Sequence, residues 1–331
     1  MRPIPLNQMT LYADLMQSVG AGDAPSGSLA FKTVKGRKYA YVTTKDGSAR
    51  VERYLGPADD AEVIAKVESF KLGAERAKYQ RNTVSLLKQG RIAAPTLPQG
   101  RILEVLANAG LFKRGMTLVG TVAYQTYACI VGYHLGAAAY ATNDIDLSVA
   151  EFVAHENEED ICSILQRADA SFKPYWHSDD KLPRIFKSGN FQVDVLTRYG
   201  RGRKSPVLIE SLGCAAAALS FQEYVAEDAM DVVALYGTGV LVRVPTPLRY
   251  AIHKLIVAQE RALRESAKKQ KDLRQAKELL DIYLETDEAA LQDSLDDARA
   301  RGRAWKSAIN ASLKEIGRES RQGRLPLPLA K

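Results

Sequence analysis

The fold is decided at Asn143-Asp144-Ile145-Asp146-Leu147-Ser148-Val149, where polar and apolar side chains alternate as in a β-strand. Residues two apart on a strand share one face, so we expect Asp144 and Asp146 side by side, with Ile145 and Leu147 pointing into a core. Adjacent carboxylates repel each other unless a cation neutralises them. Because Mg²⁺ and Mn²⁺ prefer carboxylate oxygens, the strand predicts a divalent metal site.

Two other segments strengthen this prediction. In Val119-Gly120-Thr121 a short apolar strand ends in Gly-Thr at the start of a predicted helix. Glycine lets the backbone approach a phosphate, and a hydroxyl and the free N–H groups of a helix start can bind phosphate oxygens. Asp194 lies in a later alternating strand, 191–196, and would add a third carboxylate if that strand neighbours the first.

Residues 1–98 are predicted to form an N-terminal region of a helix (6–19), a β-meander and a long helix (60–89). Glycine turns separate the three short strands of the meander, which are 30–34, 38–43 and 50–55. The meander holds no residue cluster that indicates a role. One face of the long helix is basic, which fits a solvated surface or, alternatively, a phosphate-binding one. The Pro- and Gly-containing segment 90–100 marks the boundary of this region.

Residues 99–246 are predicted to form a core in which strands and helices alternate, as in an α+β or α/β protein. Its predicted strands are 116–119, 143–149, 184–187, 191–196, 232–236 and 240–244, and its predicted helices are 122–132 and 158–168. Residues 247–331 are predicted to form a C-terminal helical domain. Its helices are 248–266, 272–285 and 288–316, the last broken at Gly302.

Length and composition fit a globular protein of two domains or three small pieces. With 331 residues, 46% apolar and 26% charged, the chain is neither wholly disordered, collagenous nor a coiled coil. No apolar run approaches the ~18 residues of a membrane span, and the start lacks a signal-peptide core, so we expect a cytoplasmic protein with no membrane partner. The 3 cysteines and 4 histidines lack metal-ligand spacing. A net charge of +7 permits a nucleotide or nucleic-acid partner.

The order Gly120-Thr121, helix, Asp144-x-Asp146 and a third carboxylate at Asp194 resembles the signature of the nucleotidyltransferase fold related to DNA polymerase β. The similarity covers about residues 100–281. It looks closest to a bacterial nucleotidyltransferase-fold family related to the AbiEii-type toxin nucleotidyltransferases. Thr121 replaces the usual Gly or Ser, and the connection from Gly120 to Asp144 is longer than in compact members. Further matching segments are 244–247, 253–255, Arg261 and 271–276.

The resemblance implies an α+β protein: a nucleotidyltransferase-fold mixed sheet core, a C-terminal helical region and a small N-terminal β-meander plus helix. It also implies an Mg²⁺- or Mn²⁺-dependent enzyme that moves an NMP from an NTP to a hydroxyl by two-metal phosphoryl transfer. Asp144, Asp146 and Asp194 would be the metal ligands and catalytic carboxylates, with Asp194 as a general base.

The nucleotide-binding positions implied by the resemblance are Gly120, Thr121, Lys254, Arg261 and Lys271. If one helix persists after Pro247, then Lys254, Arg261 and Lys268 lie along a single stripe, with Lys254 as the triphosphate contact. Lys271 and Asp272 would form either an edge of the site or an exposed helix start.

A basic, glycine-containing loop, 198–204, follows the Asp194 strand. We interpret Arg198, Arg201 and Arg203 as acceptor-binding residues for an RNA phosphate backbone, with a plain solvated loop as the alternative. The acceptor would be the 3′ end of a tRNA, a protein hydroxyl or a small molecule. By similarity to the toxin relatives, a growth-inhibiting or phage-defence enzyme with an antitoxin partner is a further hypothesis.

Two other classes of function stay open from the residues. The first is a nucleic-acid-binding protein built on an inactive transferase fold, in which the meander and the basic helix bind the nucleic acid. The second is a metal-dependent nuclease, because three aspartates also suit phosphodiester hydrolysis. The Gly-Thr element favours the transferase, since a nuclease needs no cradle for a triphosphate.

Overall fold

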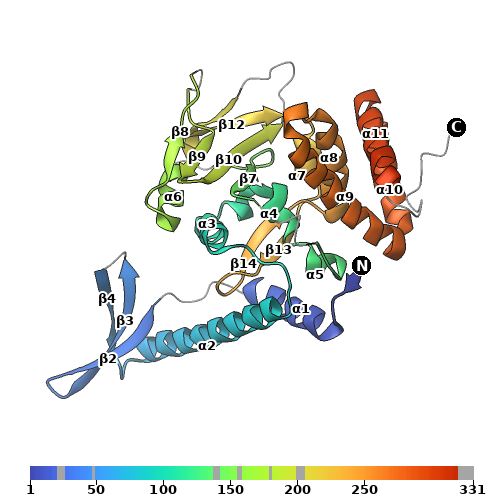
Figure 1. Ribbon diagram of the computed structural model, residues 1–331. Coiled ribbons are helices and arrows are strands. Elements are labelled where there is room, and N and C mark those ends of the chain that lie inside the picture. Colours follow the sequence, from blue (N-terminus) through green and yellow to red (C-terminus); the bar gives the residue numbers. More distant parts are fainter. Residues whose placement is uncertain are drawn as a thin grey trace.

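A mixed β-sheet forms the centre of the protein in the computed structural model, which describes residues 1–20, 27–46, 49–136, 142–154, 159–178, 181–198 and 206–319 (Figure 1). The strand order is β11-β12-β10-β7-β5, and β9 continues the sheet beside the first half of β10, followed by β8. β7 and β12 run parallel to β10, whereas β5, β9 and β11 run antiparallel to their neighbours. The bounds are β5 Thr117–Val119, β7 Asp144–Ser148, β8 Lys173–Tyr175, β9 Ile185–Ser188, β10 Phe191–Arg198, β11 Val207–Ile209 and β12 Cys214–Leu219. The predicted mixed sheet of an α+β protein is confirmed.

The register of the sheet places the acidic strand next to its two predicted companions. Asp146 of β7 lies opposite Asp194 of β10 on one side and opposite Val119 of β5 on the other. The alternate residues Ile145 and Leu147 are fully buried, as predicted. The sheet therefore has one apolar face in the core and one acidic face turned toward the C-terminal helices.

Short helices surround this sheet, and two of them correct the expected pattern. The helix predicted over 122–132 is two pieces, α4 (Gly120–Tyr124) and α5 (Ala128–Val131). A helix that was not predicted, α3 (Leu97–Asn108), begins within segment 90–100, and its start is stabilised by a 2.9 Å bond from the Thr96 N–H to Gln99 Oε1. A proline in the first helical turn is tolerated because its missing N–H would have no partner there. The other core helices are α6 (Ile161–Ala168) and α7 (Gln222–Ala226).

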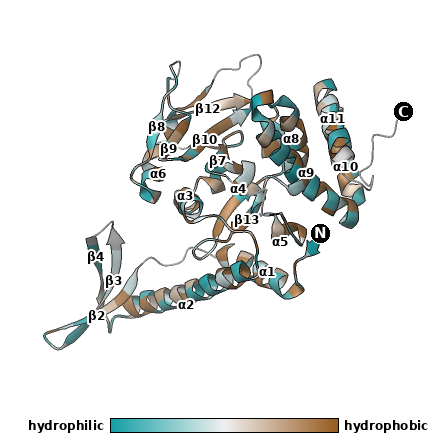
Figure 2. Cartoon of the chain, in the orientation of Figure 1, coloured by the Kyte–Doolittle hydropathy of each residue, from teal (hydrophilic) through white to brown (hydrophobic). Residues whose placement is uncertain are grey.

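The N-terminal meander is confirmed and lies at the far end of a long helix (Figure 1). β2 (Ser28–Val34), β3 (Arg37–Asp46) and β4 (Ala49–Pro57) form a three-stranded antiparallel sheet. One face of this sheet packs Ala40 against Val63 and Val67 at the start of α2 (Ala61–Gln89). Figure 2 shows hydrophilic and hydrophobic residues mixed along α2, as expected of a helix with one packed and one solvated side.

The first helix belongs to the main core. α1 (Leu6–Gly20) packs on the hairpin of β13 (Met230–Ala234) and β14 (Val240–Val244), where the Tyr12 hydroxyl donates to the Val233 carbonyl and accepts from its N–H, both at 3.1 Å. The end of α2 joins the same core through Val84 and Leu87. The two-residue strands β1 (Arg2–Pro3) and β6 (Tyr133–His134) pair nearby. The division of the chain into domains at residues 98 and 246 stays a prediction.

Within the described residues, four α-helices follow β14, and their bounds differ from the prediction in one important place. The helix expected over 248–266 ends at Glu260, and the next begins at Ser266 rather than at residue 272. The chain therefore folds back between them. The break at Gly302 is confirmed, with a φ of 147°. The bounds are α8 Pro247–Glu260, α9 Ser266–Thr286, α10 Glu288–Ala300 and α11 Arg303–Glu319. Within the described ranges, no helix combines the length and the apolar character needed to cross a membrane.

The apolar face of β7 gives a direct test of this architecture. Leu147→Ala is expected to lower the free energy of unfolding by about 2–5 kcal/mol, because it leaves a cavity in a fully buried layer. Urea denaturation followed by circular dichroism measures the change. The matched control is Leu72→Ala on α2, where the side chain is 68% exposed and the expected change is within about 0.5 kcal/mol. Equal effects of the two substitutions would contradict the burial of β7.

Candidate active site

A pocket of about 260 Å³ opens between the acidic face of the sheet and the α8–α9 pair. All eight residues predicted as metal or nucleotide ligands line it. They are Gly120, Thr121, Asp144, Asp146, Asp194, Lys254, Arg261 and Lys271. Lys268 and Asp272 line it as well. The topology thus brings together groups that lie far apart in the sequence, from Gly120 to Asp272.

Gly120 stands where the backbone passes closest to the acidic strand. Its φ is 67°, a conformation that side chains rarely adopt, and a Cβ here would lie 1.9 Å from Asp146 Oδ2. Only glycine fits this position. The following helix, α4, has just five residues, and Thr121 is 4% exposed with its Oγ1 accepting a 3.5 Å bond from Gln275 Nε2. Because the Thr121 side chain is buried, the backbone at Gly120 is the part of this element that is open to the pocket.

The carboxylates repel one another. Burial raises the pKa of Asp146 from its ordinary value near 3.8 to about 7, and the charges of Asp144 and Asp194 add to the shift. Lys254 and Lys271 oppose it. The pKa of Asp194 is also raised, first by burial and further by Asp144, although its bonds from Gln192 lower it. Both shifts reflect carboxylates that are buried beside one another, so that the charged form of each is disfavoured.

The donor set fits a hard divalent cation, since it consists of three carboxylates on adjoining strands. In this structure, however, the three carboxylates do not point toward one common position. Gln192 Nε2 donates to both oxygens of Asp194, at 2.7 and 2.9 Å, and the Thr142 hydroxyl donates to Asp144. Across the parts of the chain that the structure describes, no three His, Cys, Asp or Glu side chains are arranged closely enough to hold a metal ion. Metal binding would require Asp144 and Asp194 to exchange these hydrogen bonds for metal contacts.

A buried ion-pair cluster forms the opposite wall of the pocket. Lys254 Nζ donates to Asp272 Oδ1 at 2.7 Å, and Arg261 contacts Oδ2 of the same carboxylate through Nε and Nη2, both at 3.1 Å. Asp272 is 1% exposed, and although burial raises its pKa, the two cations outweigh burial and lower it. A buried carboxylate with two cationic partners holds both of them in place toward the pocket.

The predicted stripe of Lys254, Arg261 and Lys268 on one helix is wrong, because α8 ends at Glu260 and Lys268 belongs to α9. All three still line the pocket, since α9 folds back along α8. The alternative that Lys271 and Asp272 form an exposed helix start is also wrong. They lie in the second turn of α9 at the edge of the site. Burial and Lys254 lower the pKa of Lys271, whereas the aspartates oppose that shift.

A buried polar network joins α8, α9 and α4 behind the pocket. The Tyr250 hydroxyl donates to Gln275 Oε1 at 2.8 Å, and Gln275 continues to Thr121. Tyr250 also stacks on Tyr124 at 5.9 Å between ring centroids. Gln275 and Gln192 were missed by sequence reasoning. A signal existed only for Gln192, which lies two residues before Asp194 and therefore on the same strand face.

The predicted acceptor-binding arginines are placed only in part. Arg198 ends β10 with an exposed side chain, lies 3.8 Å from Glu151 through Nη1, and is not among the residues that line the pocket. Arg201 and Arg203 lie outside the described residues. Acceptor binding by this loop therefore stays a prediction.

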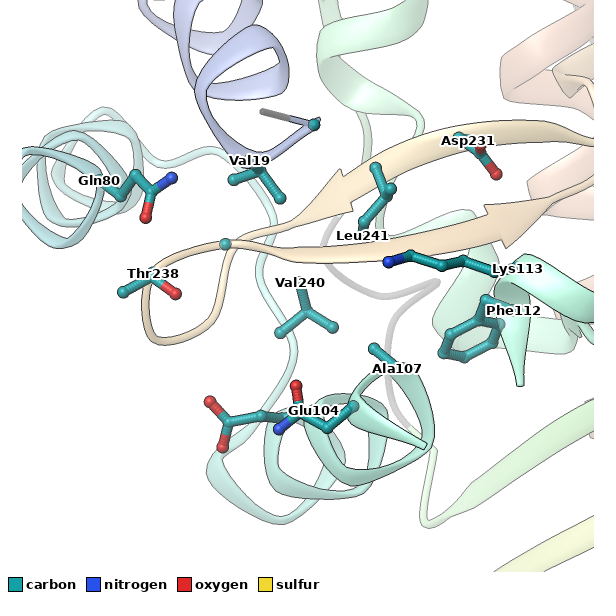
Figure 3. Close-up of a pocket in the computed structure, with 13 residues that line it drawn as sticks. Val19, Gln80, Glu104, Ala107, Phe112, Lys113, Asp231, Thr238, Val240 and Leu241 are labelled. Atoms are coloured by element: carbon teal, nitrogen blue, oxygen red, sulfur yellow. The ribbon is translucent and has the colours of Figure 1, made fainter. Parts of the chain in front are cut away.

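A second pocket, about 320 Å³ in volume, lies away from the carboxylates, between the end of α1, α3 and the β13–β14 hairpin (Figure 3). Its charged side chains are Glu104, Lys113 and Asp231. Burial raises the pKa of Glu104, and Arg101 opposes the shift. Because its rim includes Gly20, the last described residue before 21–26, we assign it no ligand.

The strand order, the glycine turn beside Asp146 and the three carboxylates that share a pocket with four cations are the features of a nucleotidyltransferase-type core. Comparison with protein families agrees: a family model described as nucleotidyltransferase matches residues 98–300, more than half of the chain. The chain belongs to this nucleotidyltransferase family. No curated protein and no solved structure matches it. The relation to AbiEii-type toxins and a bacterial origin stay predictions.

The raised pKa of Asp146 predicts a pH-dependent stability. The folded state holds this proton between pH 3.8 and about 7, whereas the unfolded chain loses it near 3.8, so stability falls as the pH rises through this window. Asp146→Asn removes the penalty. We expect it to raise the free energy of unfolding by on the order of 1–3 kcal/mol above pH 7, and by little near pH 4.

Urea denaturation without divalent metal, at several pH values, measures this difference. The matched control is Asp293→Asn on α10, an exposed aspartate that does not line the pocket, which is expected to change little at any pH. If the free energies of unfolding of the wild type and Asp146→Asn differed by the same amount at all pH values, the raised pKa would be contradicted.

Proposed function

We propose that the protein is an Mg²⁺- or Mn²⁺-dependent nucleotidyltransferase that moves an NMP from an NTP to a hydroxyl of an RNA, such as a tRNA 3′ end, or of a protein. The observation that carries the proposal is that Asp144, Asp146 and Asp194 line one pocket together with Gly120 and four cations. Family membership supports the reaction class. The identity of the metal, the identity of the acceptor and the roles of the individual residues do not follow from family membership and are part of the proposal.

Asp144, Asp146 and Asp194 would hold the metal. When bound, a divalent ion supplies charge stabilisation for the triphosphate and lowers the pKa of the acceptor hydroxyl. Asp194 would accept the proton of that hydroxyl as its oxygen attacks the α-phosphorus. The bond from the α-phosphorus to the bridging oxygen breaks, and pyrophosphate leaves. The raised pKa of Asp194 suits a proton acceptor.

The cations on α8 and α9 would bind the phosphates. Lys254 and Arg261 are held by Asp272, so their ammonium and guanidinium groups are already in position before the substrate arrives. Lys271 adds a third positive charge on the pocket wall. At Gly120, the absence of a side chain lets the backbone approach the β- and γ-phosphates.

The biological role extends the proposal by similarity. The AbiEii-type relatives suggest a growth-inhibiting toxin or a defence enzyme of the cytoplasm, with an antitoxin as partner. The nuclease alternative is less supported, because the family match and the cationic wall opposite the carboxylates both suit a bound triphosphate. The binding-protein alternative is also less supported, because all three carboxylates reach the pocket.

Labelling with α-³²P-NTPs tests this proposal. Purified protein, Mg²⁺, each NTP in turn, total RNA and cell lysate are incubated together, and label on an RNA or protein band is measured. Asp144→Asn and Asp194→Asn are expected to lower the labelling rate at least a hundredfold, on the order of what loss of a catalytic base or metal ligand costs.

Asp293→Asn is the matched control and should label at the wild-type rate. Labelling that survives both pocket substitutions would contradict the assigned site. Degradation of the RNA without label would indicate the nuclease alternative.

A further inference from the structure

We infer that the outer face of the N-terminal meander is a docking surface for single-stranded RNA, a choice of partner that rests on the proposed transfer to an RNA acceptor. The face is defined by Tyr39, Tyr41, Tyr54, Lys32 and Arg50, and we call it the tyrosine face. Its features come from the three strands and are separate from the carboxylate pocket.

The register of the sheet gathers the three tyrosines. Tyr41 of β3 lies opposite Tyr54 of β4, and Tyr39 lies two residues away on the same face of β3. The rings form one cluster, with centroids 5.4 Å apart for Tyr41–Tyr54 and 6.1 Å for Tyr39–Tyr54. Tyr54 is 53% exposed, and Tyr39 and Tyr41 are half-buried. A strand face that displays aromatic rings to solvent is a stacking platform for unpaired bases.

The opposite face of the same sheet has an ordinary structural role. Ala40, which alternates with Tyr39 and Tyr41 along β3, packs against Val63 and Val67 of α2. This face therefore supplies the contact that fixes the meander to its helix. The tyrosines on the other face make no contribution to that small core, so packing does not account for them.

Charge around the rings complements a phosphate backbone. Residues 28–57 contain seven Lys and Arg against two Asp and Glu, so this short segment carries most of the net charge of +7. On the tyrosine face itself, Lys32 lies over the Tyr41 ring at 5.1 Å and pairs with Glu52, and Arg50 is exposed. Cations beside exposed rings are the combination that binds single strands, through phosphate contacts and base stacking.

The position of the meander sets the length of RNA that can serve both sites. Val67 lies under the meander and Leu87 lies in the main core, so at about 1.5 Å per residue of α2 the two regions are roughly 30 Å apart. With about 3.4 Å per stacked nucleotide, an RNA held by the tyrosine face needs at least roughly ten nucleotides to reach the main core that holds the carboxylate pocket. The meander would therefore select long acceptors over short ones.

Fluorescence anisotropy of the full-length protein with labelled oligouridine of about 20 nucleotides tests the inference. The triple variant Tyr39→Thr/Tyr41→Thr/Tyr54→Thr keeps strand-forming residues and is expected to bind at least tenfold more weakly, since each stacked base is lost. The triple Tyr→Phe variant keeps the rings and should bind within about threefold of the wild type. Phe31→Thr, an exposed aromatic on the opposite face, is the matched control and should leave binding unchanged.

A second variant guards against misfolding of the first. Lys32→Gln/Arg50→Gln retains all three rings and should weaken binding and reduce the slope of log affinity against log salt by about 2. Binding of the wild type too weak to measure at low salt, equal binding by the triple Thr variant, or equal loss in Phe31→Thr would each overturn the inference. The assay uses no NTP, so it reports RNA binding without transfer. A wild type that binds RNA through the tyrosine face but transfers no label from any NTP therefore contradicts only the proposed function.

Discussion

The organisation of this protein depends on balancing the negative charge of three aspartates on two adjacent parallel strands. The pairing of β7 with β10 places Asp146 opposite Asp194, and the pleat places Asp144 on the same face. Burial and mutual repulsion raise the pKa of Asp146 to about 7. An arrangement that stabilised the fold alone would not keep three carboxylates here, because apolar side chains would cost less to bury.

The elements around the acidic face of the sheet accommodate and offset its negative charge. Gly120 leaves room for Asp146 where a side chain would collide with it. The turn after Glu260 brings α9 back along α8, so that Lys254 of α8, Arg261 of the turn and Lys268 of α9 line the same pocket. Asp272 binds two of these cations, which keeps them in the wall of the pocket when no phosphate is present. When a triphosphate binds, these cations would pair with its phosphates, and their electrostatic attraction to Asp146 would become weaker.

Much of this could be predicted from the sequence, because strand alternation determines which side chains share a face. The strands at 144–148, 191–198 and 240–244 and the meander follow from period-two patterns, and Asp144, Asp146 and Asp194 follow from the same rule. The end of α8 could not be predicted in this way. Residues 248–266 have no glycine or proline after Pro247 to stop a helix, and the turn depends on tertiary contacts such as that between Arg261 and Asp272. The three-tyrosine cluster also needed the register, since a bulge between Ala40 and Tyr41 decides which residues of β3 and β4 are opposite.

The proposed role of the three carboxylates is to bind a divalent cation. Electron paramagnetic resonance of free Mn²⁺, titrated with protein in the presence of a non-hydrolysable NTP analogue, measures it most directly. The account predicts that the wild type binds Mn²⁺, more tightly as the pH rises through about 7 and Asp146 loses its proton, and that Asp146→Asn weakens binding at least tenfold. Equal Mn²⁺ affinity in the wild type and in Asp146→Asn would contradict it.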